Sequence, residues 1–426
     1  MMIEGLWLVA RWDIKQRLRS RKLFIAWLVL AVVLTGLAAL LVWNYHNQSS
    51  WYAAGDWRTQ AGPEIFGFTV LLVLTFSLII VPAFAASAIV GERESSTLAT
   101  LQVTALLPGQ IAGGKLVASC VMAAAFLVAG IPALSIAVVV GHISFWRAVI
   151  CLLVVFAEMV LICAIALGWS AVAARTLVST VLTYLTVFAL CVVSVLVFAF
   201  IGSLMSTEDV DTTWTLSSSQ MQDYGEKLDS YYQQHSSPDG TQAPAPPLDQ
   251  CSWQTSDYPR MHTQLQRVWW MLLANPYVVV SDAAPLPADA KGDLERYVQG
   301  FYDPLAVIAS LVRGARAGDP ATYNDCFVRV SGVVGDGVLN TYYEVQPNRD
   351  GSFSVVRPNY TGEQPRDTAV VTRPPSPIEP SRLTMNTPLW PIGLGVHLLI
   401  AAGFFWLAVR RLAVPYGKLP KGQRIA

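Results

Sequence analysis

Six long apolar runs constrain this chain more than any other feature of its sequence. A membrane-spanning α-helix needs about 20 apolar residues, because it rises 1.5 Å per residue through a hydrocarbon core about 30 Å thick. Apolar runs of this length, without charge except for Arg147 and Glu158 in the fourth, occur at roughly 23–43, 65–90, 116–140, 146–173, 177–205 and 389–409. We therefore predict a polytopic α-helical membrane protein with six transmembrane helices. Pro82, Pro132 and Pro391 fall within these runs, and membrane helices tolerate proline where neighbours satisfy the freed carbonyls.

The charged residues are concentrated in one part of the chain. Apolar types make up 54% of the 426 residues and charged types 14%, and 35 of the 58 charged side chains lie in residues 205–385. The remaining residues are too apolar to present a charged surface to water. We therefore expect a water-soluble insertion between the fifth and sixth helices. A soluble enzyme, a disordered chain, a collagen and a nucleic-acid binder are disfavoured, and no nucleic-acid partner is expected.

Lysine and arginine near the ends of the runs predict the orientation, because these residues resist translocation. Bases cluster on both sides of the set of runs, at Arg11, Lys15, Arg17, Arg19, Arg21 and Lys22 and at Arg410, Arg411, Lys418, Lys421 and Arg424. We predict a multi-pass protein of the cytoplasmic membrane with both termini cytoplasmic and residues 206–385 extracellular. Arg58 and Arg147 would lie on the extracellular side in this orientation, which is contrary to the rule. A cleaved signal peptide is the alternative for the N-terminus, but the 22 residues before the first run exceed the usual leader.

These patterns divide the chain into four regions. Residues 1–22 are predicted to form a cytoplasmic interfacial helix, since Trp7, Leu8 and Trp12 alternate with Arg11 and Lys15 at helical spacing. Residues 23–205 hold helices one to five, residues 206–385 form the extracellular domain, and residues 386–426 hold helix six and a basic cytoplasmic tail. Alternatively, the basic residues of the first region only determine the orientation of the protein in the membrane, and no helix lies on the membrane surface.

The cytoplasmic turn at residues 91–115 is the most informative segment. Glu92, Arg93 and Glu94 end the second run abruptly, and a hydroxyl-rich stretch with regularly spaced leucines follows them. The spacing predicts a short amphipathic helix from Ser96 to just before Pro108. Such a helix would offer a soluble partner an acidic surface with an apolar stripe.

This turn resembles the cytoplasmic loop of type-2 family ABC exporter permeases. The matching residues are Glu92, Arg93, Glu94, Ser96, Thr97, Leu98, Leu101, Leu106, Pro108, Gly114 and Lys115. Ser96 departs from the family, which has glycine before the threonine. The six-helix plan also agrees, as does Asn275-Pro276-Tyr277 before the last run.

The resemblance implies a permease subunit of an ATP-driven exporter that is not itself an enzyme. Glu92, Arg93, Glu94, Thr97, Leu98 and Leu101 would form its ATPase-coupling loop. A separate ABC ATPase subunit would bind ATP and Mg²⁺, and a second identical or related permease would complete the membrane part, so the chain itself would bind no cofactor. The alternative is a non-transporting mechanotransmission or cell-envelope signalling protein, whose extracellular domain binds an extracellular partner.

A phosphate-binding loop in this chain would contradict the expectation that ATP binds only to a separate subunit. Residues 109–115 match G-x-x-x-x-G-K, but Leu116 follows and supplies no hydroxyl for Mg²⁺. No strand is predicted before the motif, and the chain enters the membrane after it. A phosphate cradle needs a strand, a turn of inward N–H groups and a free helix N-terminus. We interpret the match as coincidence.

Glu158 lies 12 residues into the fourth run, near the predicted middle of the bilayer. An ionised carboxylate there costs on the order of 3 kcal/mol or more unless it is paired or hydrated. Glu158 would be part of a transport pathway, a gate or a contact between two permeases. Alternatively, it would be protonated or hydrogen-bonded and would tie the fourth run to hydroxyl groups of the fifth. The candidate hydroxyls are those of Ser179, Thr180, Thr183 and Thr186. His397 raises the same question in the sixth run.

No catalytic motif is present, and no metal site is predicted: H-E-x-x-H, C-x-x-C and G-x-S-x-G are absent and the five histidines are scattered. Four of the six cysteines fall in apolar runs, where a thiol fills space as a small apolar group. Cys251 and Cys326 fall in the insertion, and we predict that they form a disulfide there.

The insertion is predicted to be an α+β domain. Residues 206–235, 258–282 and 304–316 show roughly helical spacing, and the second segment is either a re-entrant element at the outer leaflet or part of the domain core. Residues 326–357 alternate around Gly335-Asp336-Gly337, which predicts a three-stranded antiparallel meander.

Overall fold

The chain folds into two compact units. The computed structural model describes residues 2–19, 21–48, 57–95, 107–141, 143, 145–234, 252–255, 259–284, 303–318, 322–324, 327–334, 337–347, 353–356, 370–371 and 387–413. The first unit, here called the helical unit, comprises Met1–Ile201, Arg267–Gly314 and Thr387–Ala426. The second, called the insert unit, comprises Gly202–Gln266 and Ala315–Asn386. The division differs from the predicted domains, because residues 267–314 pack with the membrane helices.

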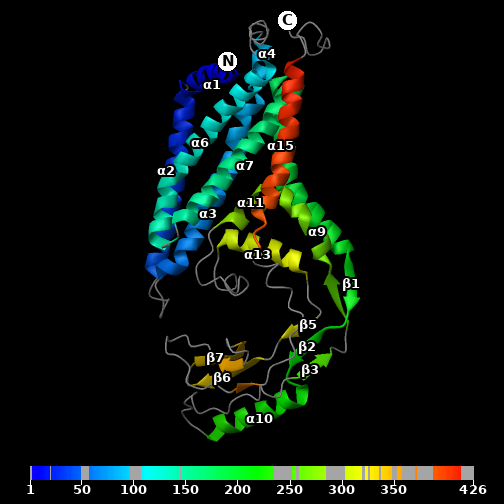
Figure 1. Ribbon diagram of the computed structural model, residues 1–426. Helices are drawn as coiled ribbons and strands as arrows, with labels where there is room; N and C mark the ends of the chain where they lie inside the picture. Colours follow the sequence, from blue (N-terminus) through cyan, green and yellow to red (C-terminus); the bar gives the residue numbers. More distant parts are fainter. Residues whose placement is uncertain are drawn as a thin grey trace. The chain divides into compact units, whose positions relative to one another are not determined.

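Six helices of the described residues are long and apolar enough to cross a membrane, as the sequence predicts. The spans are built from α2 (Arg21–Gln48), α3 (Trp57–Ala86) with α4 (Val90–Glu94), α6 (Pro108–Gly141), α7 (Phe145–Val172), α8 (Thr176–Phe188) with α9 (Ser194–Leu204), and α15 (Trp390–Leu412). Figure 1 shows them gathered into one bundle. The chain is therefore a polytopic α-helical protein of the membrane type.

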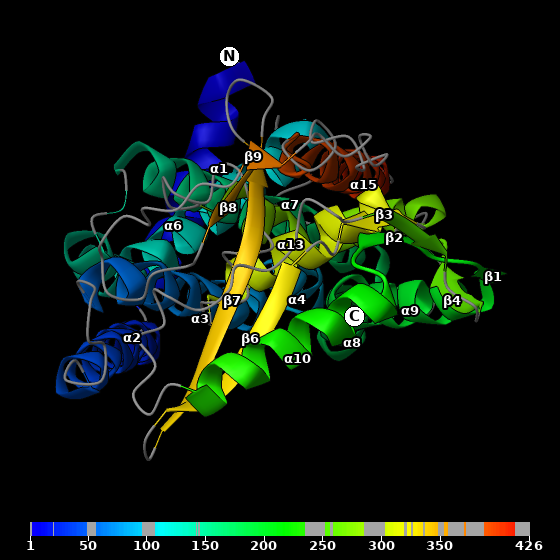
Figure 2. The ribbon, with the colours of Figure 1, turned by 90° about the horizontal axis from the view of Figure 1, so that it is seen from below.

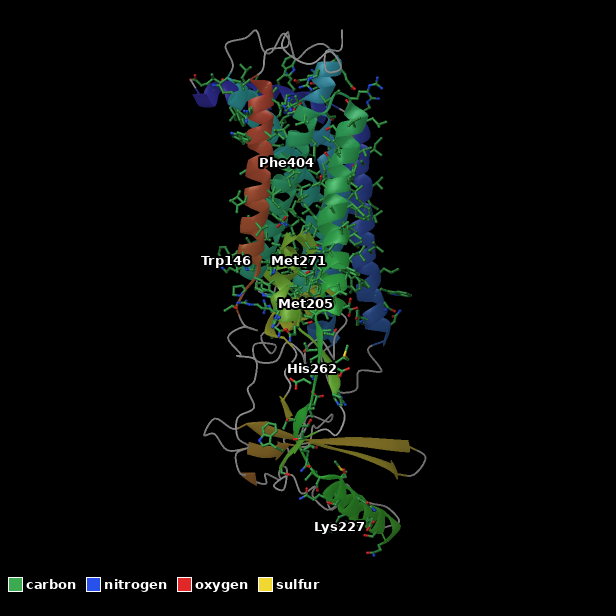
Figure 3. All side chains as sticks on the ribbon, turned by 90° about the vertical axis from the view of Figure 1, so that its right-hand side faces the viewer. Trp146, Met205, Lys227, His262, Met271 and Phe404 are labelled. Carbon is green, nitrogen blue, oxygen red and sulfur yellow. The ribbon has the colours of Figure 1, made fainter. Side chains whose placement is uncertain are left out.

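The core of the bundle lies between α3, α6 and α7. Buried Phe66 and Leu74 of α3 pack with Phe126 of α6 and Met159 of α7. The last span, α15, packs on α7, where Phe404 (labelled in Figure 3) covers the backbone of Gly168. The rings of Phe404 and Trp169 lie 5.1 Å apart. Burial of these apolar side chains fixes α7 as the central helix against which the others are placed.

The fifth span is not one continuous α-helix. Between α8 and α9 the residues Ala189–Val193 form a π-helix, η2. A π-helix places one extra residue in a turn and changes the local hydrogen-bond pattern, often at functional positions. The sequence alone predicts an uninterrupted helix here, since all five residues are apolar and carry no break signal.

The N-terminal helix α1 (Met2–Leu18) is separate from the first span, in agreement with the predicted helix before it. It crosses the end of the bundle (Figure 1) and rests on the first turns of α6. An ideal Cβ at Gly114 would lie 2.8 Å from the carbonyl oxygen of Leu6, so only glycine permits this approach. Trp7, Leu8 and Trp12 remain exposed on the other face of α1.

A short hairpin of helices enters the bundle before the last span. It consists of the 3₁₀ helix η5 (Trp269–Ala274), α11 (Pro276–Ala283) and, after a gap, α13 (Pro304–Ala317). The predicted helix over 258–282 is wrong, because Asn275 is extended before Pro276 and strand β4 and two 3₁₀ helices precede it. The predicted helix over 304–316 is confirmed.

Asp282 of α11 fixes the start of the last span. Its Oδ2 accepts hydrogen bonds from the backbone N–H groups of Leu389 and Trp390, at 2.5 and 2.9 Å. Its Oδ1 accepts from Nε of Arg313 and lies 2.7 Å from Nη2 of the same side chain. The first amides of a helix have no partner within the helix, so this carboxylate satisfies two of them from outside.

The described residues of the insert unit form small sheets and one long helix. Strand β1 (Ser206–Asp209) pairs antiparallel with β4 (Arg260–Thr263), and β2 (Thr212–Thr215) lies between antiparallel β3 (Ser252–Thr255) and parallel β5 (Thr322–Asn324). Helix α10 (Ser218–Gln234) follows β2. The helical spacing predicted over 206–235 is therefore wrong for its first part, where cross-strand pairing prevails.

The predicted antiparallel meander is confirmed and gains a fourth strand. The order is β6 (Phe327–Val334), β7 (Gly337–Pro347), β8 (Phe353–Val356) and β9 (Val370–Val371), and Figure 2 shows β6 and β7 running side by side. Val334 of β6 pairs with Gly337 of β7, and residues 335–336 between them lie outside the described residues. Cys251 and Cys326 lie outside the described residues, and their disulfide stays a prediction.

Candidate functional site

Arg93 of the predicted coupling loop lies inside the bundle rather than on its surface. Its side chain is 2% exposed. Nη1 donates to the carbonyl of Ala173 at 2.9 Å and Nη2 to that of Ala171 at 3.2 Å. These carbonyls stand at the C-terminal end of α7, where the helix dipole favours a positive charge. Arg93 therefore joins α4 to α7.

Glu92 and Glu94 connect α4 to two other spans. Oε1 of Glu92 lies 2.6 Å from Nζ of Lys115, which is 1% exposed and belongs to α6. Glu94 accepts from the backbone N–H of Thr176 at 2.9 Å and from its hydroxyl at 2.5 Å. Thr176 begins α8, so the carboxylate satisfies an amide at a helix N-terminus.

We call Glu92, Arg93, Glu94 and these partners the clasp. The clasp ties the end of the second span to α6, α7 and α8 through three adjacent side chains. Ser170 adds two further hydrogen bonds, because its hydroxyl accepts from the backbone N–H groups of Ile89 and Val90 at 3.0 and 3.1 Å. Thr97, Leu98 and Leu101 of the predicted coupling loop lie outside the described residues, as does the amphipathic helix expected there.

The segment that matches a phosphate-binding loop is helical. Residues 109–115 lie in the first turns of α6, which begins at Pro108. Lys115 points to Glu92 and is buried, so its ammonium is not available to a nucleotide in this arrangement. The fold of this segment agrees with the interpretation of the match as coincidence.

Glu158 of α7 is fully buried and bonds to the last span. Both of its carboxyl oxygens lie 2.8 Å from Nδ1 of His397 on α15. The predicted partners on the fifth span are not used: the hydroxyl of Ser179 donates to Ala86, and those of Thr180, Thr183 and Thr186 donate within their own helix. Sequence reasoning named His397 separately but had no signal that would pair it with Glu158.

A second bond continues this network into the helical hairpin. Nε2 of His397 lies 2.8 Å from the carbonyl oxygen of Ala274, the last residue of η5. The next residue, Asn275, donates through Nδ2 to the carbonyl of Cys191 at 2.8 Å. Cys191 is the central residue of the π-helix η2. We call Ala274 and Asn275 the tip, because they turn the chain between η5 and α11.

Asp303 is a buried acid at the end of the helical unit opposite the clasp. Its Oδ1 accepts from the backbone N–H of Leu305 at 3.0 Å at the start of α13. It sits directly on the backbone of Gly67, where a Cβ would overlap the carboxylate. Burial raises the pKa of Asp303 to about 7, against the effect of its backbone hydrogen bonds, and nearby Glu64 adds to the increase.

The described residues hold no group of three or more His, Cys, Asp or Glu side chains that could bind a metal ion. Neither the protein-family models nor the curated proteins compared with this chain give a match. The geometry of the chain itself therefore carries what can be inferred about its function.

Proposed function

We propose that this chain is the membrane-spanning permease subunit of an ATP-driven ABC exporter. In this proposal a separate ATPase subunit docks on the turn after the second span, and a second permease completes the membrane part. Both termini and the clasp face the cytoplasm, and the insert unit faces outward. The observation that supports the proposal is the clasp, which links the start of that turn to three spans at once.

The clasp suggests how force would reach the spans. Residues 96–106 connect α4 to α6 in the sequence, so a partner that moves them would move Glu92, Arg93 and Glu94 first. The contacts to Lys115, to the last carbonyls of α7 and to Thr176 would then pull on α6, α7 and α8 together. Helix α1, packed on Gly114, would follow α6. A conformational change of this kind requires contacts that differ between the two states.

The chemistry of ATP belongs to the partner in this proposal. The described residues offer no phosphate loop, since the matching segment is a helix with its lysine buried against Glu92. The permease would supply the path and the ATPase would bind ATP and Mg²⁺. The substrate of such an exporter would be a drug, a lipid, a peptide or a glycan.

A charge swap across the clasp tests the proposal. The tagged chain is purified from its native membranes in mild detergent, copurifying chains are identified by mass spectrometry, and ATP hydrolysis is measured in nanodiscs. We expect an ATPase subunit to copurify. Glu92→Lys and Lys115→Glu should each uncouple hydrolysis from the permease, because each leaves like charges facing one another, and the double variant should restore coupling. Lys115 suits this test because it is buried, so its substitution does not remove a direct contact with the ATPase subunit.

The matched control is Lys227→Glu, which reverses an exposed charge on α10 of the insert unit. It should leave coupling unchanged. Purified complexes without an ATP-hydrolysing chain, or single clasp variants that retain full coupling, would contradict the proposed function.

Mechanotransmission without transport is the second candidate, and the size of the insert unit, with three sheets of its own among the described residues, favours it. The two candidates share the ATPase and the clasp. ATP-dependent movement of lipid or of a dye across proteoliposomes supports an exporter. Coupled ATP hydrolysis with no such movement supports mechanotransmission.

A further inference from the structure

The tip lies deep among the spans. His397, which bonds to Ala274, comes seven residues after Trp390 at the start of α15, so the tip reaches about 10 Å below the start of that span at 1.5 Å per residue. On the opposite side Asn275 reaches Cys191 in the middle of the fifth span. The hydroxyl of Tyr277 adds a contact of 2.9 Å to Thr75 of α3. The hairpin is thus held by side chains and backbone of three spans.

The bonding at His397 fixes where protons must be. A backbone carbonyl only accepts hydrogen bonds, so Nε2 of His397 carries the hydrogen that goes to Ala274. A carboxylate likewise only accepts, and an unprotonated Nδ1 also only accepts. The contact of 2.8 Å between Nδ1 and Glu158 is therefore a hydrogen bond only if one further proton lies on either group.

We propose that Glu158 and His397 form a proton-binding site whose single shared proton keeps the tip in place. With that proton, the pair is neutral whether it is written as imidazolium and carboxylate or as imidazole and carboxylic acid. Without it, a buried carboxylate faces the lone pair of Nδ1 and the imidazole ring turns away. The bond from Nε2 to Ala274 is then lost with the ring orientation that supports it.

The surroundings favour the singly protonated state. Glu158 is 0% exposed and His397 is 1% exposed, so neither charge is hydrated. Removing the proton leaves a net charge of −1 in an apolar core and adding a second leaves +1, and burying either charge is costly. A change in conformation that hydrates the pair would remove this penalty, and the proton would leave as the tip moves.

The second bond of the tip does not depend on a proton. Asn275 donates from an amide to the carbonyl of Cys191, and neither group titrates. The tip is therefore held on one side by a proton-dependent bond to α15 and on the other by a constant bond to η2. Only the first bond can respond to pH.

Other groups around the pair must be separated from it in any measurement. The titratable side chains on the surrounding elements are thiols and a phenol, at Cys151 and Cys163 on α7, Cys120 on α6, Cys191 on η2 and Tyr277 on α11, and two acids, Glu64 on α3 and Asp303 at the start of α13. The charged pair Asp282–Arg313 stands at the far end of α11, and Lys115 stands at the clasp. A variant that removes only the shared proton distinguishes the pair from all of these.

Glu158→Gln is that variant. Its amide N–H can donate to unprotonated Nδ1 without any shared proton, so the orientation of His397 and its bond to Ala274 are kept. Glu158→Ala removes the partner altogether. Asn275→Ala removes the constant bond and leaves the shared proton. These three changes separate the proton from the contact.

Hydrogen exchange of the tip, measured by mass spectrometry in nanodiscs, tests the proposal. We follow the peptide covering residues 269–283 between about pH 6 and about pH 9, corrected for the intrinsic rate. In the wild type the protection should fall about tenfold or more as pH rises, which is the effect expected for loss of one buried hydrogen bond. Glu158→Gln should hold its protection constant. Asn275→Ala should lower protection about tenfold at every pH and keep the slope.

Two results would overturn the proposal. One is wild-type protection that does not change with pH, and the other is a slope that persists in Glu158→Gln, since it would belong to another group. Should Glu158→Ala fail to fold, the comparison of the wild type with Glu158→Gln still decides. The measurement requires no ATPase, so its failure leaves the proposed function untouched, and its success does not depend on that function.

Discussion

The two ends of the helical unit hold their acids in opposite ways. At the clasp, Glu92 and Glu94 face an ammonium group and a helix N-terminus, both of which stabilise negative charge. At the other end, Asp303 is buried beside Glu64, and its pKa is raised to about 7. Asp282, which also lies there, faces Arg313 and two amides instead. The same carboxyl chemistry thus gives charged contacts at both ends and, at Asp303 alone, an acid whose pKa lies near 7.

The difference shows what each end can respond to. Contacts between full charges depend on salt and on mechanical displacement, and they change little near neutral pH. A buried acid with a pKa near 7 changes its charge in that range. We therefore expect the clasp end to respond to what is bound or pulled, and the opposite end to respond to pH.

Arg93→Met should have the largest effect on stability. It leaves the carbonyls of Ala171 and Ala173 without their buried donor, which corresponds to a loss of about 4 kcal/mol. The midpoint of thermal unfolding in detergent should fall by several degrees. Exposed Arg175→Met is the control, and equal melting of the two variants would show that the clasp is not what stabilises this end.

Asp303→Asn should make the opposite end insensitive to pH. The folded-state pKa of about 7 lies above the ordinary value of 3.8, so the stability of the wild type is full below about pH 4 and falls as pH rises through about 7. Asparagine cannot ionise and still caps α13. The variant should equal the wild type at about pH 4 and exceed it by on the order of 4 kcal/mol at about pH 8. This prediction would be contradicted if the difference in melting midpoint between the variant and the wild type were the same at every pH.

Gly67→Ala tests how tightly Asp303 is packed at the same end of the helical unit. A methyl group at this position overlaps the carboxylate of Asp303, which cannot move without releasing the start of α13. We expect a loss of about 2 kcal/mol. Gly36→Ala on α2 is the control, since its Cβ meets nothing within 4 Å, and it should be neutral or slightly stabilising.

Glu94→Gln should have the smallest effect. Glu94 is exposed, and a glutamine oxygen can still accept from the N–H of Thr176. The melting midpoint should stay near that of the wild type and should lose its small dependence on salt. A loss as large as that of Arg93→Met would mean that the three clasp residues do not act as separate contacts.

Much of the fold could be predicted from the sequence because it follows from local periodicity. The six spans, α1, α13 and the turn between β6 and β7 all carry their signal within a window of a few residues to about 20. The helix predicted over 258–282 failed where pairing of Arg260–Thr263 with distant β1 decided the structure. The π-helix η2 was not predicted for a related reason: its apolar residues are compatible with either an α-helix or a π-helix, so the sequence carries no signal for the difference.

The candidate site was predictable in its residues but not in its contacts. Glu92, Arg93, Glu94 and Glu158 stood out because charge next to or inside an apolar run is costly. Their partners lie far along the chain, with Glu158 meeting His397 across 239 positions. Nothing in a single sequence specifies such a pair, because it depends on which spans become neighbours.

The bond between Asp282 and the first amides of α15 has a consequence for the lipid environment. A transmembrane helix normally adjusts to bilayer thickness by sliding or tilting at low cost. Here the first residues of the last span are fixed to α11, which is itself anchored by Arg313. In a thicker or thinner bilayer this span cannot shift along its axis, so the mismatch must be taken up by its C-terminal end, where Arg410 and Arg411 can extend toward the headgroups.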